Sequence, residues 1–208
     1  MGTCSCASRY DNIFLPREAE ILRAARVTET EKHFTLKMKE GAMHYAPGQI
    51  LEVGLHGYGE IPIGFASSPT RPHTFDIVVR TVGRVSTAVN KLEKGDSLFV
   101  RGPLGTGFNL DLLRGNPVLI VAAGIGLCPT RSLIQYILDR RHEFGRFTLF
   151  FGCRSPKEQL FHDDLNRWRE SADGVRHPSV SARDYASARA VRDPGHFAVR
   201  IRTFTCSP

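Results

Sequence analysis

A glycine pair that follows a strongly apolar run is the part of this chain whose residue types most clearly indicate chemistry. The run covers residues 118–122, the glycines are Gly124 and Gly126, and Pro129 and Thr130 then open a segment with helical character. Glycines at the end of a buried parallel strand let the backbone come close to a ligand. The amides at the start of the following helix, with about half a positive charge, then face that ligand. The pattern Gly-x-Gly-x-x-Pro predicts a dinucleotide pyrophosphate site; the alternative is a strand–turn–helix joint whose glycines only allow tight packing.

A second group of residues suited to phosphate lies earlier in the chain. Gly83 permits a tight turn, and the amides of Val85, Ser86 and Thr87 open a short predicted helix. The hydroxyls of Ser86 and Thr87 add further donors, although a serine that simply begins a helix is the alternative for Ser86. Arg80 lies one loop earlier. Its planar guanidinium could pair with a phosphate or could belong to the surface rim of a sheet.

The segments that would position these residues change in type halfway along the chain. Partial apolar alternation in the first half predicts strands at residues 19–28, 33–38, 49–55, 74–80 and 97–101, with a short helix at 85–92. Strands at this spacing are typical of a small antiparallel β-barrel. In the second half, predicted strands alternate with predicted helices, in the order 118–122, 130–141, 147–151 and 156–171. This alternation indicates parallel βαβ units.

These patterns predict two domains and a tail. A flexible N-terminus covers residues 1–16, the antiparallel barrel covers 17–113, and an incomplete α/β domain with a parallel sheet covers 114–174. Residues 175–208 contain no lysine and no glutamate, are rich in Arg, Ser, Ala and Pro, and show no lasting helix or strand period. A solvated basic extension is one interpretation of this tail, and translation out of frame is the other.

The net charge of +7 bears on nucleic-acid binding. Six arginines against two aspartates place four of these charges in residues 175–208, so the excess does not lie on a patterned face of the fold. Basic residues also do not alternate with aromatic ones, as they do in proteins that bind single strands. The composition therefore predicts no nucleic-acid partner.

Several features bear on the cellular compartment. No apolar run is long enough to cross a bilayer, and residues 1–16 lack the apolar core of a signal peptide. Five cysteines at irregular spacing do not make a disulfide framework. The expected location is therefore the cytoplasm. Cys128 is expected to be a small packed side chain rather than a nucleophile.

Two groups of residues resemble metal sites. Cys4 and Cys6 have the spacing of half a site, but no second pair follows, so free thiols are expected. His162, Asp163 and Asp164 lie together on a predicted helix, where solvated side chains are expected. The sequence predicts no metal site.

Taken together, a barrel followed by a βαβ unit with Gly-x-Gly-x-x-Pro resembles the ferredoxin–NADP reductase superfamily. Five further motifs carry the resemblance: Tyr-Ala-Pro-Gly-Gln at 45–49, Phe-Ala-Ser-Ser-Pro at 65–69, Gly-Arg-Val-Ser-Thr at 83–87, Arg-Gly-Pro-Leu-Gly-Thr-Gly-Phe at 101–108 and Gly-Cys-Arg-Ser-Pro at 152–156. The sequences of these motifs are most similar to those of the gamma subunits of cytosolic nickel–iron hydrogenases (sulfhydrogenases) and of the electron-transfer subunit of dihydroorotate dehydrogenase. The resemblance covers about residues 19–172.

The resemblance implies an FAD site in the barrel and an NAD(P) site in the α/β domain. It assigns to FAD the residues Ile63, Gly64, Phe65, Ala66, Ser67, Val79, Arg80, Gly83, Val85, Ser86 and Thr87. It assigns to the nicotinamide dinucleotide the residues Gly124, Gly126, Pro129, Thr130, Cys153 and Arg154. Backbone groups up to Ser67 are expected to face the isoalloxazine ring. No catalytic side chain is implied, because the flavin carries the chemistry, and Arg154 alone does not distinguish NAD from NADP.

Two departures from the family pattern change these expectations. Where the family has Arg-x-Tyr-Ser, this chain has Ile61, Pro62, Ile63 and Gly64, which lack the guanidinium, the aromatic ring and the hydroxyl. Weaker retention of flavin is therefore expected. Relatives also continue well beyond the region of Trp168, with further strands and a four-cysteine [2Fe–2S] cluster whose ligands this sequence lacks. C-terminal truncation is expected, with one sheet edge and part of the nucleotide pocket open.

The resemblance thus implies an FAD-dependent NAD(P)H oxidoreductase subunit. It would pass electrons between NAD(P)H and an iron–sulfur or hydrogenase partner, such as a hydrogenase or dihydroorotate dehydrogenase-type catalytic subunit. A truncated, non-catalytic interaction module of the same complex is the alternative. DNA binding through the basic tail is a third and less favoured hypothesis.

Overall fold

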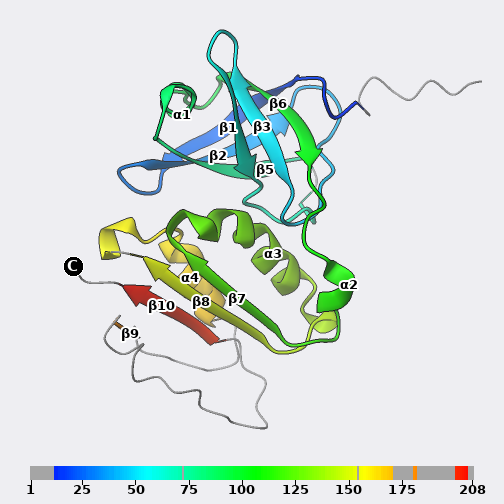
Figure 1. Cartoon of the computed structure of the whole chain (residues 1–208), viewed down its shortest axis with the longest axis vertical. Coiled ribbons are helices and arrows are strands. Elements are labelled where there is room, and N and C mark those ends of the chain that lie inside the picture. The colour runs from blue at the N-terminus through cyan, green and yellow to red at the C-terminus, as the bar shows by residue number, and fades with distance from the viewer. Residues whose placement is uncertain (1–11, 72, 154, 171–179, 182–199, 206–208) are drawn as a thin grey trace, which may run out of the picture.

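The computed structural model describes residues 12–71, 73–153, 155–170, 180–181 and 200–205. Figure 1 shows a β-barrel formed by the first half of the chain, stacked on a layer of helices and parallel strands formed by the second half. The expectations for residues 1–11, which include Cys4 and Cys6, and for Arg154 lie outside the described residues.

The barrel is a six-stranded antiparallel sheet in the order β4-β3-β6-β1-β2-β5. Its strands are β1 (Arg17–Arg26), β2 (Glu31–Met38), β3 (Ile50–Leu55), β4 (Gly59–Gly64), β5 (Phe75–Arg80) and β6 (Ser97–Leu104). An isolated bridge between Phe65 and Ile77 joins the chain just after β4 to β5, so the two edges of the sheet meet. The predicted antiparallel barrel is confirmed. The short helix α1 (Arg84–Val89) packs against β3, β4 and β5.

The barrel core follows from the alternation along its strands. In β2, Phe34, Leu36 and Met38 are buried, whereas Lys37 is exposed. Phe65 is fully buried and stacks on the ring of Tyr45, with 3.8 Å between the ring centroids. Aromatic side chains bury large apolar areas, so such contacts contribute much of the stability of a small barrel.

The apolar pattern predicts neither β4, which only the family resemblance implies, nor the short helix α2 (Leu110–Leu113). β4 contains Gly59, Pro62 and Gly64, residue types that are depleted in strands. It forms nevertheless, because β4 is the edge strand next to β3, where the missing N–H of a proline costs no ladder hydrogen bond. α2 begins at Asn109, whose side chain accepts a hydrogen bond from the amide of Leu112.

The second half is built around a parallel sheet in the order β7-β8-β10-β9. Its strands are β7 (Val118–Ala123), β8 (Phe147–Cys153), β9 (Val180–Ser181) and β10 (Arg200–Thr205). Its helices are α3 (Leu127–Asp139) and α4 (His162–Glu170), with the one-turn elements η1 (Gly124–Gly126), η2 (Arg141–Glu143) and η3 (Pro156–Glu158). β7, α3 and β8 form the predicted parallel βαβ unit.

Two expectations for this half are wrong. Residues 156–171 do not form one helix, because Phe161 has a φ of 53° and separates η3 from α4. A residue in the left-handed region cannot continue a right-handed helix. The tail, expected to lack regular structure, contains β9 and β10. β10 pairs in parallel with β8, so β8 is not an open edge of the sheet.

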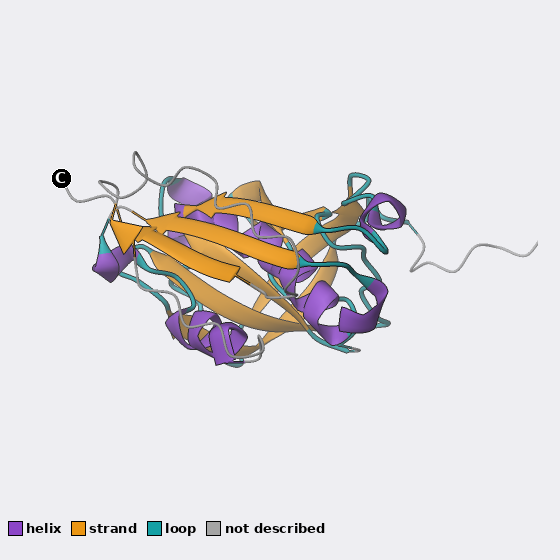
Figure 2. Cartoon of the chain, turned by 90° about the horizontal axis from the view of Figure 1, so that it is seen from below, coloured by secondary structure: helices purple, strands orange, loops and turns teal. Residues whose placement is uncertain are grey.

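Helix α3 lies between the barrel and the sheet (Figure 1). Residues 131–137 are all buried, as expected for a helix that is enclosed on every side. Alternate residues of β7 pack toward the helices, whereas Leu119 and Val121 are 61% and 71% exposed on the opposite face. Figure 2 shows α3 and α4 on one side of the strands, so the described helices cover one face of this sheet.

The core should respond strongly to the loss of one ring. Phe34→Ala removes a fully buried side chain and leaves a cavity, so we expect a loss of about 3–5 kcal/mol in the free energy of unfolding. Phe99→Ala is the control, because Phe99 on β6 is 39% exposed and its removal leaves no closed cavity. Urea titrations of both variants measure the difference. Equal losses would contradict the assigned core.

Candidate functional site

The turn between β7 and α3 leaves open space beside its backbone. Gly124 has a φ of 50°, in the region that favours glycine, and Gly126 is the residue before the first turn of α3. A Cβ atom built on either glycine would meet no other atom within 4 Å. Pro129 lies in the first turn of the helix, where its missing N–H costs little. The hydroxyl of Thr130 donates to the backbone of its own helix, at 3.1 Å from the carbonyl oxygen of Gly126.

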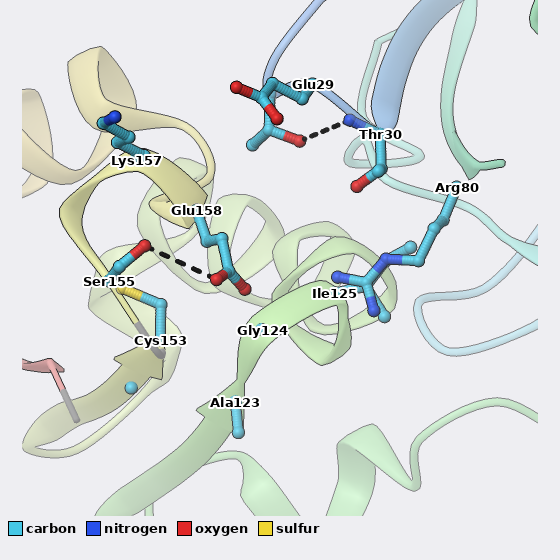
Figure 3. Close-up of a pocket in the computed structure, with 12 residues that line it drawn as sticks. Glu29, Thr30, Arg80, Ala123, Gly124, Ile125, Cys153, Ser155, Lys157 and Glu158 are labelled. Atoms are coloured by element: carbon cyan, nitrogen blue, oxygen red, sulfur yellow. Dashed lines mark hydrogen bonds between the residues drawn. The ribbon is translucent and has the colours of Figure 1, made fainter. Parts of the chain in front are cut away.

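A cavity of about 770 Å³ opens beside this turn. Its wall combines the hairpin between β1 and β2, the end of β5, and the carboxyl ends of β7 and β8 (Figure 3). The lining residues are Thr28, Glu29, Thr30, Arg80, Ala123, Gly124, Ile125, Gly152, Cys153, Ser155, Lys157 and Glu158. The cavity thus brings together Arg80, Gly124 and Cys153 from the predicted site. Ligands of α/β proteins bind outside the carboxyl ends of the sheet strands, and this cavity lies at the same place.

Sequence reasoning missed most of this wall. Thr28, Glu29 and Thr30 belong to a hairpin of the barrel, and only the packing of the two halves places them opposite Gly124. Glu158 follows β8 within η3, and Figure 3 shows its carboxylate beside Ser155 at the rim of the cavity. No motif or spacing in the sequence marks these residues as neighbours.

A buried carboxylate holds Arg80 at the cavity wall. The Nε atom of Arg80 donates to Glu31, whose side chain is only 2% exposed. The hydroxyls of Thr28 and Thr30 also donate to Glu31, the latter at 2.9 Å. Figure 3 shows the guanidinium directed toward Ile125. Because its Nε atom is already paired, Arg80 is held in an orientation suited to presenting its terminal nitrogens to an anion.

The loop before α1 forms a second open turn. Gly83 is exposed, and a Cβ atom there would meet nothing within 4 Å. The Oγ atom of Ser86 accepts from the amides of Val82 and Gly83, at 3.0 and 2.9 Å, and donates to the carbonyl of Gly83. The Ser86 hydroxyl therefore closes the turn, as in the alternative interpretation of this residue. Val85 and Thr87 are partly exposed on the same helix.

The segment expected to face the flavin is buried from Phe65 onward. Phe65, Ala66 and Ser67 are buried, and Val79 on β5 is fully buried as well. The hydroxyl of Tyr45 donates to the carbonyl of Ser67 at 3.0 Å, and burial raises the pKa of Tyr45 to about 12.

The side chain of Ser67 is also used within the chain. Its Oγ atom accepts from the amide of Asp76 at 2.8 Å. The expectation that backbone groups up to Ser67 face a flavin remains a prediction. The partly exposed residues at the end of the edge strand β4 are Ile63 and Gly64.

Gly64 explains one departure from the family pattern. A Cβ atom at this position would lie 2.7 Å from the Cβ atom of Pro129, closer than real Cβ atoms approach other atoms. The end of β4 and the proline of Gly-x-Gly-x-x-Pro are thus in direct contact. A serine at position 64 has no room unless Pro129 moves, so the absence of the hydroxyl follows from the way the two halves pack.

Charged side chains are buried where the halves meet. Arg131 on α3 is 6% exposed at its side chain and pairs with Asp164 at 2.6 Å and with Asp76 at 3.1 Å. It also donates to the carbonyl of Ala66, and its guanidinium lies 4.4 Å from the ring centre of Phe161. Asp164 is therefore buried and paired, which corrects the expectation that it is solvated. Buried charges of this kind are tolerated only when paired and hydrogen-bonded.

The pKa of the Asp76 carboxyl lies below its ordinary value. Burial alone would raise this pKa, but the neighbouring ring of His33, the guanidinium of Arg131 and the hydroxyl of Thr35 lower it. The Nε2 atom of His33 lies 3.1 Å from a carboxylate oxygen of Asp76. The carboxylate therefore links β5, β2 and α3 through charge-assisted contacts.

The described part of the chain contains no group of three or more His, Cys, Asp or Glu side chains arranged for a metal ion. Within the same ranges, every helix is too short or too polar to span a bilayer.

Two family descriptions match the chain in the order of its two halves. The oxidoreductase FAD-binding domain matches residues 19–108, and the oxidoreductase NAD-binding domain matches residues 120–195. The fold is similar to ferredoxin-NADP+ reductase from Plasmodium falciparum, with a TM-score of 0.69, 13% identity, and coverage of 94% of this chain and 73% of that one. The two halves of the chain thus match an oxidoreductase FAD-binding domain and an oxidoreductase NAD-binding domain, and their fold is that of ferredoxin–NADP reductases. Phthalate dioxygenase reductase gives a TM-score of 0.68 at 20% identity, covering 93% of this chain and 60% of that one.

Two curated relatives show which proteins of this fold the chain resembles in sequence. Sulfhydrogenase 1 subunit gamma of Pyrococcus furiosus is 35% identical over 167 residues, which are 78% of this chain and 57% of the relative. The probable dihydroorotate dehydrogenase B (NAD(+)) electron transfer subunit of Thermococcus kodakarensis is 35% identical over 130 residues, covering 62% of this chain and 50% of the relative. The chain therefore spans about half the length of these relatives.

The contact between Gly64 and Pro129 predicts a specific intolerance. Gly64→Ser adds a hydroxyl where the family often has one, yet it overpacks this contact, so we expect a loss of about 1–3 kcal/mol in the free energy of unfolding. Gly83→Ser is the matched control, because the added side chain meets open space and should leave stability nearly unchanged. Urea denaturation followed by circular dichroism compares them. A Gly64→Ser chain as stable as the control would show that the contact is loose.

The thiol of Cys128 should not react in the folded chain. Burial raises its pKa to about 12 from an ordinary value of 9.0, so it stays protonated, and the thiolate is the reactive form. Iodoacetamide at mildly alkaline pH should modify Cys128 only after denaturation, as mapped by mass spectrometry. Since the folded pKa is the higher one, the stability from keeping this thiol neutral is complete below pH 9.0 and is lost as the pH rises toward 12. Rapid labelling of the folded chain would contradict the assigned burial.

Proposed function

We propose that this chain binds FAD on the barrel and NAD(P)H in the 770 Å³ cavity, and acts as a flavin-dependent NAD(P)H oxidoreductase within an electron-transfer complex. One observation carries the proposal. An open glycine turn lies in each half, at Gly83 and at Gly126, and a Cβ atom on either would enter free space. The flavin part is proposed to cover residues 17–113, and the dinucleotide part to begin at residue 114.

The barrel residues fit a flavin nucleotide. Gly83 leaves room for a phosphate group beside the first turn of α1. Arg80, three residues earlier, lines the cavity itself, so its oriented guanidinium is proposed to face cofactor phosphates at the boundary between the two sites. Ile63 and Gly64, at the end of an edge strand, are proposed to offer backbone groups to the ring. Val85 and Thr87 complete the proposed phosphate turn, since the Ser86 hydroxyl is already used.

The cavity residues fit a nicotinamide dinucleotide. A volume of about 770 Å³ lies in the range of nucleotide and cofactor pockets. Gly124 and Gly126 let a pyrophosphate approach the N-terminus of α3, which is thirteen residues long and favours an anion there. Cys153, at the end of β8, is proposed to lie beside the ribose, together with Arg154.

The proposed chemistry asks the protein for orientation rather than for acid–base catalysis. FAD, when bound, supplies a hydride acceptor that can release electrons one at a time. The residues of the two turns are proposed to bind and orient the two nucleotides, and the packing of α3 on the barrel fixes the position of one turn relative to the end of β4. No side chain needs to give or take a proton for hydride transfer, so we assign no catalytic residue.

The names of the relatives suggest the electron partner. We propose a catalytic subunit of the hydrogenase or dihydroorotate dehydrogenase type, reached through an iron–sulfur centre, because the relatives named above are a gamma subunit and an electron transfer subunit. The cytoplasm is the proposed location, since the thiol of Cys128 is free, as is usual in reducing compartments.

Two matched substitutions test the two sites separately. Gly126→Val should weaken NADH binding by about tenfold or more while FAD content stays normal, because the new side chain fills only the space beside the α3 turn. Gly83→Val should lower FAD content while the apoprotein still binds NADH. Calorimetric titration with NADH and the flavin absorbance of the purified chain measure both properties.

The wild-type chain provides the direct test of activity. Loaded with FAD under anaerobic conditions, it should lose its oxidised flavin absorbance when NADH or NADPH is added. A chain that binds both nucleotides but shows no reduction would favour the non-catalytic module. A chain that binds neither would refute the proposed function.

A further inference from the structure

Helix α3 meets the chain that follows β4 in a repeating register. Arg131 donates to the carbonyl of Ala66. One turn later, the side-chain oxygen of Gln135 accepts from the amide of Ser68 at 3.0 Å. One further turn along, Asp139 accepts from the hydroxyl of Thr70 at 2.5 Å. We call these three pairs, 131 with 66, 135 with 68 and 139 with 70, the α3 row.

The spacing of the α3 row has a simple geometric cause. Residues 131, 135 and 139 follow one another at intervals of four, about one helical turn or 6 Å each, so their side chains lie along one face of α3. That face meets residues 66–70, the segment that leads from the end of β4 into a turn. A shift of one residue in either element would break all three pairs, so the row fixes the helix along its axis.

Two further contacts fasten the start of the helix. The side chain of Ser132 accepts from the amide of Gly48 at 3.3 Å. Pro129 packs against Gly64, so closely that a Cβ atom on Gly64 would lie 2.7 Å from it. The helix end that carries the Gly124–Gly126 turn is thereby held against the end of β4, where we place the flavin ring.

Arg131 is the residue of the row whose side chain has polar contacts with both halves. It contacts Ala66 and Asp76 in the barrel and Asp164 on α4, and all three partners are buried. Removing one member of a buried charge cluster leaves the others unpaired, which disrupts packing more than the loss of a surface pair does. Arg131 is also not a lining residue of the cavity, so a change there does not remove a direct ligand contact.

We infer that the α3 row sets the distance between the two cofactor sites, and that Arg131 is a positioning residue for hydride transfer. The inference rests on the proposed function. Hydride transfer requires the reacting atoms to lie about 3–3.5 Å apart, and a misplacement of about 1 Å can cost a hundredfold in rate. The row controls this distance because one site is attached to each of the two elements that it joins.

The test compares Arg131→Gln with Arg140→Gln in the full chain. Arg140 lies at the end of the same helix but is 47% exposed and pairs with Glu143, so it is a matched control. Arg131→Gln should slow the reduction of bound flavin by NADH about tenfold or more in anaerobic stopped-flow measurements. FAD content and the Kd for NADH should stay within about twofold. Arg131→Lys should restore part of the rate, because it keeps the charge but not the planar fork.

A second readout needs no cofactor. The amides of Gly48 and Ser68 donate to side chains of α3, so their hydrogen exchange reports on this junction alone. In Arg131→Gln both amides should exchange about tenfold faster or more, while the amides of the β1–β2 ladder stay unchanged. The Arg140→Gln chain should match the wild type in both measurements.

The outcomes separate this inference from the proposed function. The inference would be overturned if the Arg131→Gln chain reduced its flavin at the wild-type rate and its Gly48 and Ser68 amides exchanged at the wild-type rate. If NADH fails to reduce the wild-type flavin, the proposed function fails, and the exchange data still decide whether Arg131 holds the junction. If Arg131→Gln does not fold, Gln135→Met replaces it. That variant removes the acceptor for the Ser68 amide without unpairing a charge, and the same two results are expected in weaker form.

Discussion

The packing of helix α3 on the barrel is the constraint on which the rest of this structure depends. The helix is enclosed by the sheet on one side and by the chain after β4 on the other, and its buried apolar residues belong to the core of the second half. Ala66 and Val78 of the barrel belong to the same buried cluster as Leu133 and Ile134 of the helix. The two halves therefore share apolar surface and would each expose it if separated.

The polar groups at this junction are arranged to make the shared surface specific. Apolar contacts alone would allow the helix to slide, because the hydrophobic effect is not directional. Hydrogen bonds and the charges of Arg131, Asp76 and Asp164 select one register. The open glycine turns lie at the ends of elements held in this way, so the geometry of the cavity follows from the interior of the molecule.

Much of this fold can be predicted from the sequence, and the exceptions have physical reasons. Alternation in β2 and the apolar run of β7 identify these strands, because a half-buried strand and a buried parallel strand have distinct patterns. β4 escapes prediction because its glycines and proline contradict strand propensity, and only its position at the edge permits them. The break at Phe161 has no signal, since its residue type does not favour the left-handed region that tertiary packing imposes on it.

Some residues of the candidate site could likewise be predicted from the sequence, and others could not. The open glycine turns were predictable as turns, because glycines after a strand and before a helix leave a local pattern of residue types. Glu31 and the hairpin at Thr28–Thr30 were not, because their role depends on contacts between segments far apart in the chain. The buried position of Asp164 was also hidden, since an acidic residue in a first helical turn usually faces water.

The contact between Gly64 and Pro129 has a consequence for how such proteins can diverge. One position belongs to the barrel and the other to the nucleotide motif, yet the space at each depends on the atoms of the other. A lineage that gains a larger residue at position 64 must also change position 129 or displace the helix. The effects of substitutions at the two positions should therefore not be additive, and a chimera that joined this barrel to the second half of a distant relative would have to accommodate this contact anew.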